Sequence, residues 1–144
     1  MAQEAVKAGY STPTLHVASI EKSIAFYELL GFTLIDSTDD KPLGWARLHC
    51  ESGSIMFLRA EHTVDPSKQG FLLYLYTPDL PALREQLIAA GVDTGAIKRP
   101  EYMQSGMINF RDPDGYIIEI GQWGREEHEK WEQHLAQRAA AGQK

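Results

Sequence analysis

Cysteine is nearly absent from this sequence, since Cys50 is the only one among 144 residues. A single thiol can form neither an internal disulfide framework nor a cysteine-based zinc site, and this favours a reducing compartment. Long apolar runs are missing as well, so neither a signal-peptide core nor a membrane span is expected. We therefore expect a cytoplasmic protein of one domain, or of two small halves that share a core.

Positive charge is also scarce. The chain has 14 lysines and arginines against 20 aspartates and glutamates, which gives a formal net charge of −6. This balance argues against nucleic acid as the main partner, because binding to a phosphate backbone needs a surplus of basic side chains. A hydrophobic share of 43% with 24% charged residues is ordinary for a soluble globular chain. Neither nucleic acid nor a membrane is therefore an expected partner.

The sequence contains two stretches with the same order of predicted elements. In the first, a strand at 15–17 precedes a helix that Ser19 caps and Gly31 ends, followed by strands at 32–36, 44–50 and 54–59. In the second, a strand at 71–76 precedes a helix that Asp79 caps and Gly91 ends, followed by strands near 94–98, 104–111 and 116–120. The pattern predicts an α+β fold with two β-α-β-β-β modules and mixed sheets.

Domain boundaries follow from this repeat. Residues 61–70 are polar and are interpreted as a linker between a first module at 12–60 and a second at 71–122. Residues 1–11 form an N-terminal tail. Residues 123–144 are interpreted as a charged C-terminal helix and tail, in which Trp131 and Leu135 lie one turn apart on one face. We expect this narrow stripe to pack on the domain or on a partner subunit.

Alternation along each strand divides the side chains between two faces of a sheet, and the more apolar set is expected to face the helix. On the opposite face we expect His16 and Glu119, together with aromatic, basic and polar side chains that we assign to ligand binding: Trp45, Arg47, His49, Phe57, Arg59, Tyr74, Tyr76, Met107 and Asn109. A partly enclosed pocket fits this mixture best. Its rings either form a stacking box for a planar or cationic ligand or fill the cavity as core.

Glu119 interrupts the apolar run Tyr-Ile-Ile-Glu-Ile that follows the turn Asp-Pro-Asp-Gly. An unpaired buried carboxylate is costly, so we expect Glu119 to point into the pocket. There it is either a metal ligand or general base, or a carboxylate paired with Arg47 or Arg59. His16 leaves a similar choice between an acid–base group and a neutral imidazole bonded to Glu119 or Tyr76.

These motifs resemble those of the vicinal oxygen chelate superfamily, which includes glyoxalase I, bleomycin-resistance proteins, fosfomycin-resistance enzymes and extradiol dioxygenases. The resemblance spans residues 12–122. It rests on Leu-His-Val before Ser-Ile-Glu-Lys-Ser-Ile-Ala-Phe-Tyr-Glu-Leu-Leu-Gly-Phe, and on Phe-Arg-Asp-Pro-Asp-Gly-Tyr-Ile-Ile-Glu-Ile. It implies two modules whose cupped sheets enclose a pocket, commonly in a homodimer.

In metal-dependent members of that superfamily, the ligands come from the first and last strands of the modules. By position, His16 and Glu119 match two of these ligands, whereas the other two places fall at Phe57 and Tyr76. Phenylalanine cannot bind a metal, and tyrosine binds one only as a phenolate, from a pKa near ~10. Since catalytic zinc sites ordinarily hold three protein ligands, we favour no cofactor. If the protein does bind a divalent metal, we expect zinc, nickel, manganese or iron.

Two functions fit these residues. The first is a glyoxalase/bleomycin-resistance-like protein that binds a small organic molecule in the cupped-sheet pocket, without a full metal site. The alternative is a divalent-metal-dependent lyase, isomerase or dioxygenase of the glyoxalase type. In that case His16 and Glu119 are the catalytic residues and hold an ion that stabilises an enolate-like charge. The sequence leaves open whether the protein is an enzyme.

Overall fold

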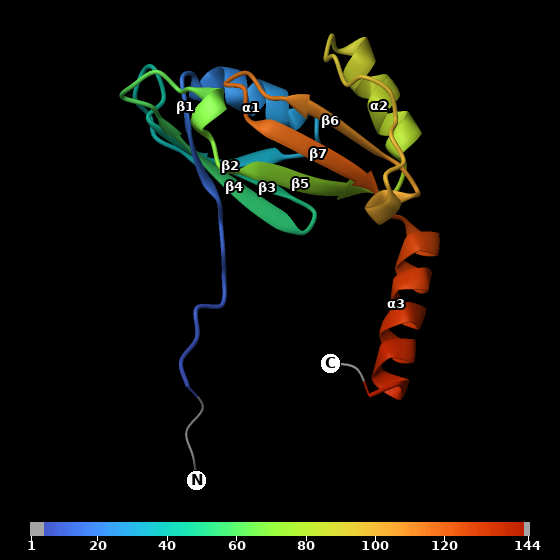
Figure 1. Ribbon diagram of the computed structural model, residues 1–144. Coiled ribbons are helices and arrows are strands. Elements are labelled where there is room, and N and C mark those ends of the chain that lie inside the picture. Colours follow the sequence, from blue (N-terminus) through green and yellow to red (C-terminus); the bar gives the residue numbers. More distant parts are fainter. Residues whose placement is uncertain (1–4, 143–144) are drawn as a thin grey trace. The chain divides into compact units, whose positions relative to one another are not determined.

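A computed structural model describes residues 5–142 of the chain. The described part divides after Asp65 into two units, each of which has its own sheet (Figure 1). Within residues 5–142, no helix combines the length and the apolar character that a bilayer crossing requires.

The first unit has the predicted order β-α-β-β-β. Its elements are β1 (Thr14–Val17), α1 (Ile20–Glu28), β2 (Thr33–Ser37), β3 (Trp45–Cys50) and β4 (Gly53–Arg59). The sheet has the strand order β1-β4-β3-β2, with β1 parallel to β4 and the remaining pairs antiparallel. As predicted, the Ser19 side chain caps α1 by accepting the Lys22 backbone N–H at 3.3 Å.

The helix α1 packs on one face of this sheet, where it contacts β2, β3 and β4. The rings of Tyr27 in α1 and Phe57 in β4 lie 5.1 Å apart, and both side chains are completely buried. Leu48 and Ile55 are buried on the same face. Phe57 is therefore part of the core beneath the helix.

The predicted face of β4 is wrong by one residue. Strand pairing places Phe57 opposite Ala46 and Ile55 opposite Leu48, so both belong to the helix face. Met56 and Leu58 take the opposite face instead. The sequence of β4 is apolar on both faces, so its alternation could not fix the orientation; pairing with β3 decides it.

Arg59 is also displaced from the predicted pocket by this register. It follows Phe57 on the helix face at the exposed end of β4. Its guanidinium donates hydrogen bonds to the carbonyls of Pro42 and, at 3.2 Å, Leu43. Arg59 therefore holds the loop between β2 and β3.

The second unit contains a three-stranded sheet. Its elements are η1 (Pro66–Lys68), β5 (Leu72–Thr77), α2 (Leu80–Ala89), η2 (Glu101–Met103), β6 (Met107–Arg111), β7 (Ile117–Gln122) and α3 (Arg125–Ala140). The strand order is β5-β7-β6, with β5 parallel and β6 antiparallel to β7. Ile108, Ile118 and Ile120 are buried on the face toward α2, as strand alternation predicts.

The strand expected near 94–98 does not form. A single bridge remains, in which Lys98 and Met107 exchange two backbone hydrogen bonds of 2.8 Å. Gly95 has a φ of +63°, which lies outside the range of a regular β-strand, and its N–H donates to the Asp93 side chain at 3.2 Å. This turn bends the chain before it can pair along β6.

The turn before β7 forms as its residues predict. The Asp112 carboxylate accepts the backbone N–H groups of Asp114 and Tyr116 at 2.9 and 3.0 Å. Gly115 adopts a φ of +90°, and its carbonyl accepts a hydrogen bond from Arg111 at 2.7 Å. These contacts fix the point at which the chain enters β7.

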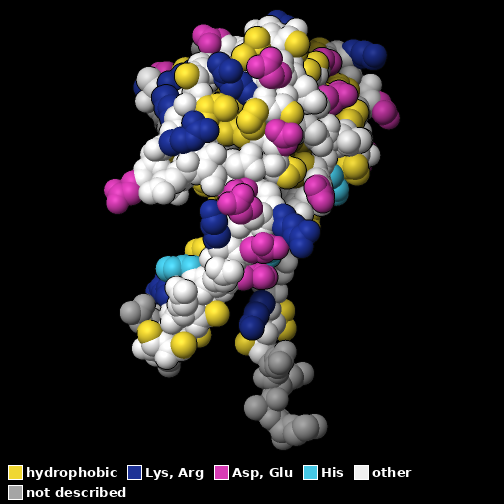
Figure 2. Space-filling model, turned by 90° about the vertical axis from the view of Figure 1, so that its right-hand side faces the viewer, with side chains coloured by type: hydrophobic (Ala, Val, Ile, Leu, Met, Phe, Trp, Pro, Cys, Tyr) yellow, Lys and Arg dark blue, Asp and Glu magenta, His cyan; other side chains and the backbone are white. Residues whose placement is uncertain are grey.

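The C-terminal helix α3 extends from the end of β7 (Figure 1) and has no buried residue. Acidic, basic and hydrophobic side chains are mixed along it (Figure 2). Pairs of opposite charge one turn apart lie within 3.0 Å, namely Arg125 with Glu129 and Lys130 with Glu126. Trp131 and Leu135 lie on it as predicted and remain 45% and 44% exposed.

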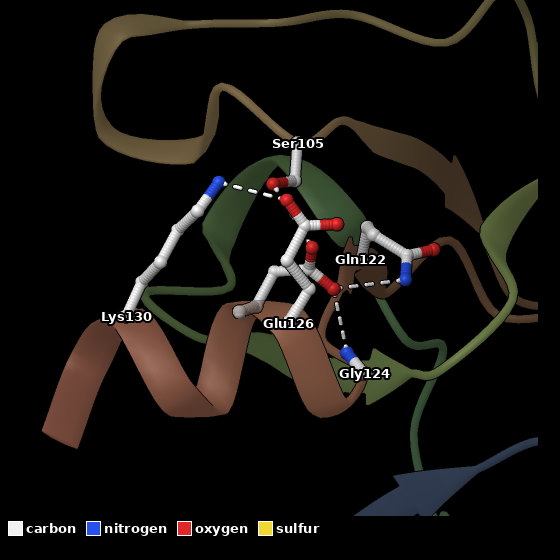
Figure 3. A network of polar contacts seen from close by, with 6 residues as sticks. Ser105, Gln122, Gly124, Glu126 and Lys130 are labelled. Carbon is white, nitrogen blue, oxygen red and sulfur yellow. Dashed lines mark hydrogen bonds and ion pairs between the residues drawn. The ribbon is translucent and has the colours of Figure 1, made fainter.

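A polar network ties the first turn of α3 to the sheet (Figure 3). The Glu127 carboxylate accepts the Gly124 backbone N–H at 2.8 Å, the Gln122 side-chain amide at 3.1 Å and the Ser105 hydroxyl at 3.4 Å. Gln122 also accepts the Leu80 N–H at 2.8 Å, which joins the starts of two helices. These bonds, the backbone one foremost, lower the pKa of Glu127.

Acidification is expected to loosen α3. Because the pKa of Glu127 is lowered in the folded chain, its stabilisation is complete above the ordinary glutamate range and disappears as the pH falls through the lowered value. The protection factor of the Gly124 amide, which is its intrinsic exchange rate at each pH divided by the rate measured by NMR, should fall between pH 7 and pH 3. In Glu127→Gln, which can accept the same hydrogen bond without titrating, this pH dependence should be smaller. Equal pH dependence in both proteins would contradict the assignment.

Candidate functional site

The candidate site in the second unit is the sheet face opposite α2, here called the open face of sheet 2. It carries Tyr74 and Tyr76 of β5, Met107 and Asn109 of β6, and Glu119 of β7, the strand between them. Tyr74 and Asn109 are the direct cross-strand partners of Glu119. The carboxylate thus lies on the middle strand, on the face opposite α2.

Glu119 lies between two polar strand neighbours, Tyr74 and Asn109, in a cross-strand row. Burial raises the pKa of the Tyr74 phenol, and the nearby Tyr76 and Glu119 raise it further. Tyr74 is therefore a neutral hydrogen-bond donor at physiological pH. Lys98 reaches the Asn109 side-chain oxygen at 3.5 Å from the edge of the sheet. The row can offer a ligand one carboxylate flanked by neutral donors.

Aromatic rings continue from this row toward α3. The Tyr74 and Tyr76 rings lie 5.1 Å apart, Tyr76 and Trp123 5.7 Å, and Trp123 and Trp131 6.3 Å. Tyr76 remains 60% exposed, so a ring face is available to a planar molecule. Sequence reasoning missed Trp123 as a member of this group, because it follows β7 and has no place in the strand alternation.

Gly121 lets other side chains cover part of the open face of sheet 2. A side chain there would lie 2.9 Å from the Met103 methyl group and 3.2 Å from the Tyr74 hydroxyl. Met103 itself is buried, and the neighbouring Tyr102 hydroxyl donates to the Met107 sulfur at 3.3 Å. The residues of η2 therefore form one wall beside Tyr74.

The first unit has a corresponding face opposite α1, here called the open face of sheet 1. It carries His16 of β1, Trp45, Arg47 and His49 of β3, and Met56 and Leu58 of β4. The Met56 sulfur accepts weak hydrogen bonds from the Trp45 indole at 3.4 Å and from Arg47 at 3.5 Å. Sequence reasoning missed Met56 and Leu58 here, because of the shifted register of β4.

Strand pairing thus places most of the predicted site residues on the open faces. On sheet 1 these are His16, Trp45, Arg47 and His49; on sheet 2 they are Tyr74, Tyr76, Met107, Asn109 and Glu119. Phe57 and Arg59 lie on the helix side of sheet 1. His16 and Glu119 belong to different units, so their expected place along one pocket stays a prediction.

Neither open face, taken alone, gathers enough donor side chains for a metal site. Within residues 5–142 no group of three or more His, Cys, Asp and Glu side chains is placed to bind an ion. The strand partner of His16 is Leu58, and that of Tyr76 is Gly121, neither of which supplies a donor atom. An ion at Glu119 would find only a phenol and an amide as its strand neighbours, a poor set for zinc.

Comparison with known proteins extends this picture. The model of the Glyoxalase/Bleomycin resistance protein/Dioxygenase superfamily matches residues 10–120. A bleomycin-binding protein solved with bleomycin is 25% identical, with a TM-score of 0.64 over 81% of this chain and 99% of that one. No match was found among curated proteins.

Two further solved structures share the fold at lower identity. The fosfomycin resistance protein FosX from Listeria monocytogenes is 18% identical, with a TM-score of 0.66 over 85% of this chain and 98% of its own. A lactoylglutathione lyase from Agrobacterium tumefaciens is 15% identical, with a TM-score of 0.61 over 81% and 94%. The α+β architecture agrees with the family match over most of the chain, and the chain belongs to the glyoxalase/bleomycin resistance protein/dioxygenase superfamily.

Proposed function

We propose that this protein binds a small organic molecule on its open sheet faces, with no complete metal site. The observation that carries the proposal is the row Tyr74–Glu119–Asn109, which places a carboxylate between neutral donors beside the exposed ring of Tyr76. A ring face next to a carboxylate suits a planar molecule that carries positive charge or hydrogen-bond donors. The bleomycin-binding relative gives the same class of function a precedent. We also expect a homodimer and a cytoplasmic location.

The experiment uses a planar cation of known size as its probe. Titration of the isotopically labelled protein with benzamidine, followed by NMR, should shift the amide signals of β5 and β7. In Glu119→Gln the dissociation constant should rise at least about tenfold, because a charge-assisted hydrogen bond is worth roughly 1.5–3 kcal/mol. Glu85→Gln on the exposed face of α2 is the matched control and should bind as the parent does. Equal weakening in both variants, or no binding of any probe in a wider fragment screen, would refute the proposal.

The second candidate function is that of a divalent-metal-dependent enzyme, and one comparison supports it. A FosX variant from Listeria monocytogenes was solved with Mn(II) and a dihydroxypropylphosphonic acid, at 17% identity and a TM-score of 0.67. In this chain His16 and Glu119 are the expected ligands for such an ion. Elemental analysis after dialysis against zinc, nickel, manganese and iron separates the candidates. About one ion per chain, lost in Glu119→Gln, would favour the enzyme.

A further inference from the structure

Arg47 lies half-buried on the open face of sheet 1, and its guanidinium has few hydrogen-bond partners. Among residues 5–142, the only polar partner of its guanidinium is the Met56 sulfur at 3.5 Å. A thioether is a weak acceptor, whereas a guanidinium presents five donors in a planar fork. The cross-strand neighbour Asp36 accepts the Ser37 backbone N–H at 2.9 Å and makes no ion pair with Arg47 within the described chain. Arg59, by contrast, is satisfied by two loop carbonyls.

His49 is a second polar side chain on this face that lacks a hydrogen-bond partner for one of its atoms. It follows Arg47 by two residues in β3 and therefore lies on the same face. Its Nε2 atom is shielded from water and has no hydrogen-bond partner among the described residues. An unpaired buried nitrogen is costly, and an acceptor atom beside it would remove that cost.

The surroundings of this pair suit an organic anion. Residues two apart in a strand are separated by roughly 6.6 Å, so long side chains at the two positions can converge on one small group. Trp45 precedes Arg47 on the same face and offers an indole as a stacking surface. Beyond His49, a cleft of ≈ 250 Å³ opens beside the turn between β3 and β4, with Tyr10 and Ser54 among its lining residues.

We infer that Arg47 and His49 form a binding site for the oxyanion of a small planar ligand, such as a carboxylate, with Trp45 against the ligand's ring. The Arg47 fork donates to the two oxygens, and the Nε2–H group of His49, uncovered as the ligand enters, donates to one of them. This inference rests on the proposed function, because it takes the oxyanion to be part of the small organic molecule that the protein binds. It assigns chemistry to sheet 1, whereas the proposed function was argued from Glu119 on sheet 2.

Three probes of one shape but different charge test this site. Benzoate, benzamide and benzamidine should be titrated into the labelled full-length protein and followed by NMR. Benzoate should shift the amide signals of β3 and bind at least about tenfold more tightly there than benzamide. In Arg47→Gln that preference should fall by about tenfold, and Arg47→Lys should recover only part of it, because lysine lacks the fork. His49→Gln should also weaken benzoate. Arg138→Gln on α3 is the matched control and should leave benzoate binding unchanged.

The outcomes separate this inference from the proposed function. If benzamidine binds through Glu119 while benzoate does not shift β3, or binds equally well to Arg47→Gln, the oxyanion site is refuted and the proposed function stands. If benzoate binds as expected while benzamidine binds equally well to the parent and to Glu119→Gln, the oxyanion site on sheet 1 is supported and the proposed role of Glu119 is refuted. Circular dichroism on each variant shows whether it is folded. Should Arg47→Gln not fold, the comparison of His49→Gln with Arg138→Gln carries the test.

Discussion

Replacing Phe57 by alanine is expected to destabilise the first unit by about 3–5 kcal/mol, the range for a large aromatic side chain lost from a core. Phe57 is fully buried and its ring lies 5.1 Å from that of Tyr27, so truncation removes this ring contact between β4 and α1 and leaves a cavity. Urea denaturation followed by circular dichroism measures the change. The same variant distinguishes the two orientations of β4, because a pocket residue would affect ligand binding rather than stability.

Leu58→Ala provides the matched comparison. Leu58 is the next residue of β4, lies on the open face of sheet 1 and is 38% exposed. Its truncation should cost about 1 kcal/mol, since most of the transfer and cavity terms are absent at a partly exposed position. If Leu58→Ala proved the more destabilising of the two, the register of β4 described above would be incorrect.

Gly115→Ala is expected to destabilise the second unit by about 2–4 kcal/mol, from two separate causes. The residue has a φ of +90°, a conformation that L side chains rarely adopt. In addition, a methyl group there would lie 2.6 Å from Cβ and 2.8 Å from Cγ of Pro66, closer than carbon atoms can approach. Thermal and urea unfolding of the variant give the total loss.

Gly91→Ala separates the two causes within the same chain. Gly91 ends α2 with a φ of +88°, almost the same as that of Gly115, but a methyl group there would meet nothing within 4 Å. Its substitution should therefore cost only the conformational part, about 1–2 kcal/mol. The difference between the two variants measures the clash with Pro66. Equal losses would mean that the segment containing Pro66 moves aside freely.

The conformation of Gly115 matters for function because it helps to set the position of Glu119. The turn that Gly115 completes sets where β7 begins, and thereby which residue of β7 pairs with Tyr74 and Asn109. A shift of one residue would turn Glu119 toward α2 and move both Ile118 and Ile120 to the open face of sheet 2. The motif Asp-Pro-Asp-Gly is therefore structural, and it orients the carboxylate on which the proposed function depends.

Local signals in the sequence determined the element order and most of the strand orientations. Ser19 and Asp79 cap helices, glycines with positive φ end them, and the strand Tyr-Ile-Ile-Glu-Ile has one polar residue whose placement in the core would be costly. Where only one face of a strand is apolar, as in β3 and β7, alternation alone places Arg47, His49 and Glu119 on the open faces. The family resemblance followed from the same local motifs.

Tertiary structure alone decided the features for which the local signal was balanced. In β4 both faces are apolar, and pairing with β3 buries Phe57 while exposing Leu58. Near residue 95, a positive φ outweighs the strand-like composition and leaves the second sheet with three strands. The unsatisfied donors of Arg47 and His49 also appear only when neighbouring strands show what each side chain meets. A sequence shows which groups a side chain carries, whereas hydrogen-bond satisfaction depends on atoms distant in the chain.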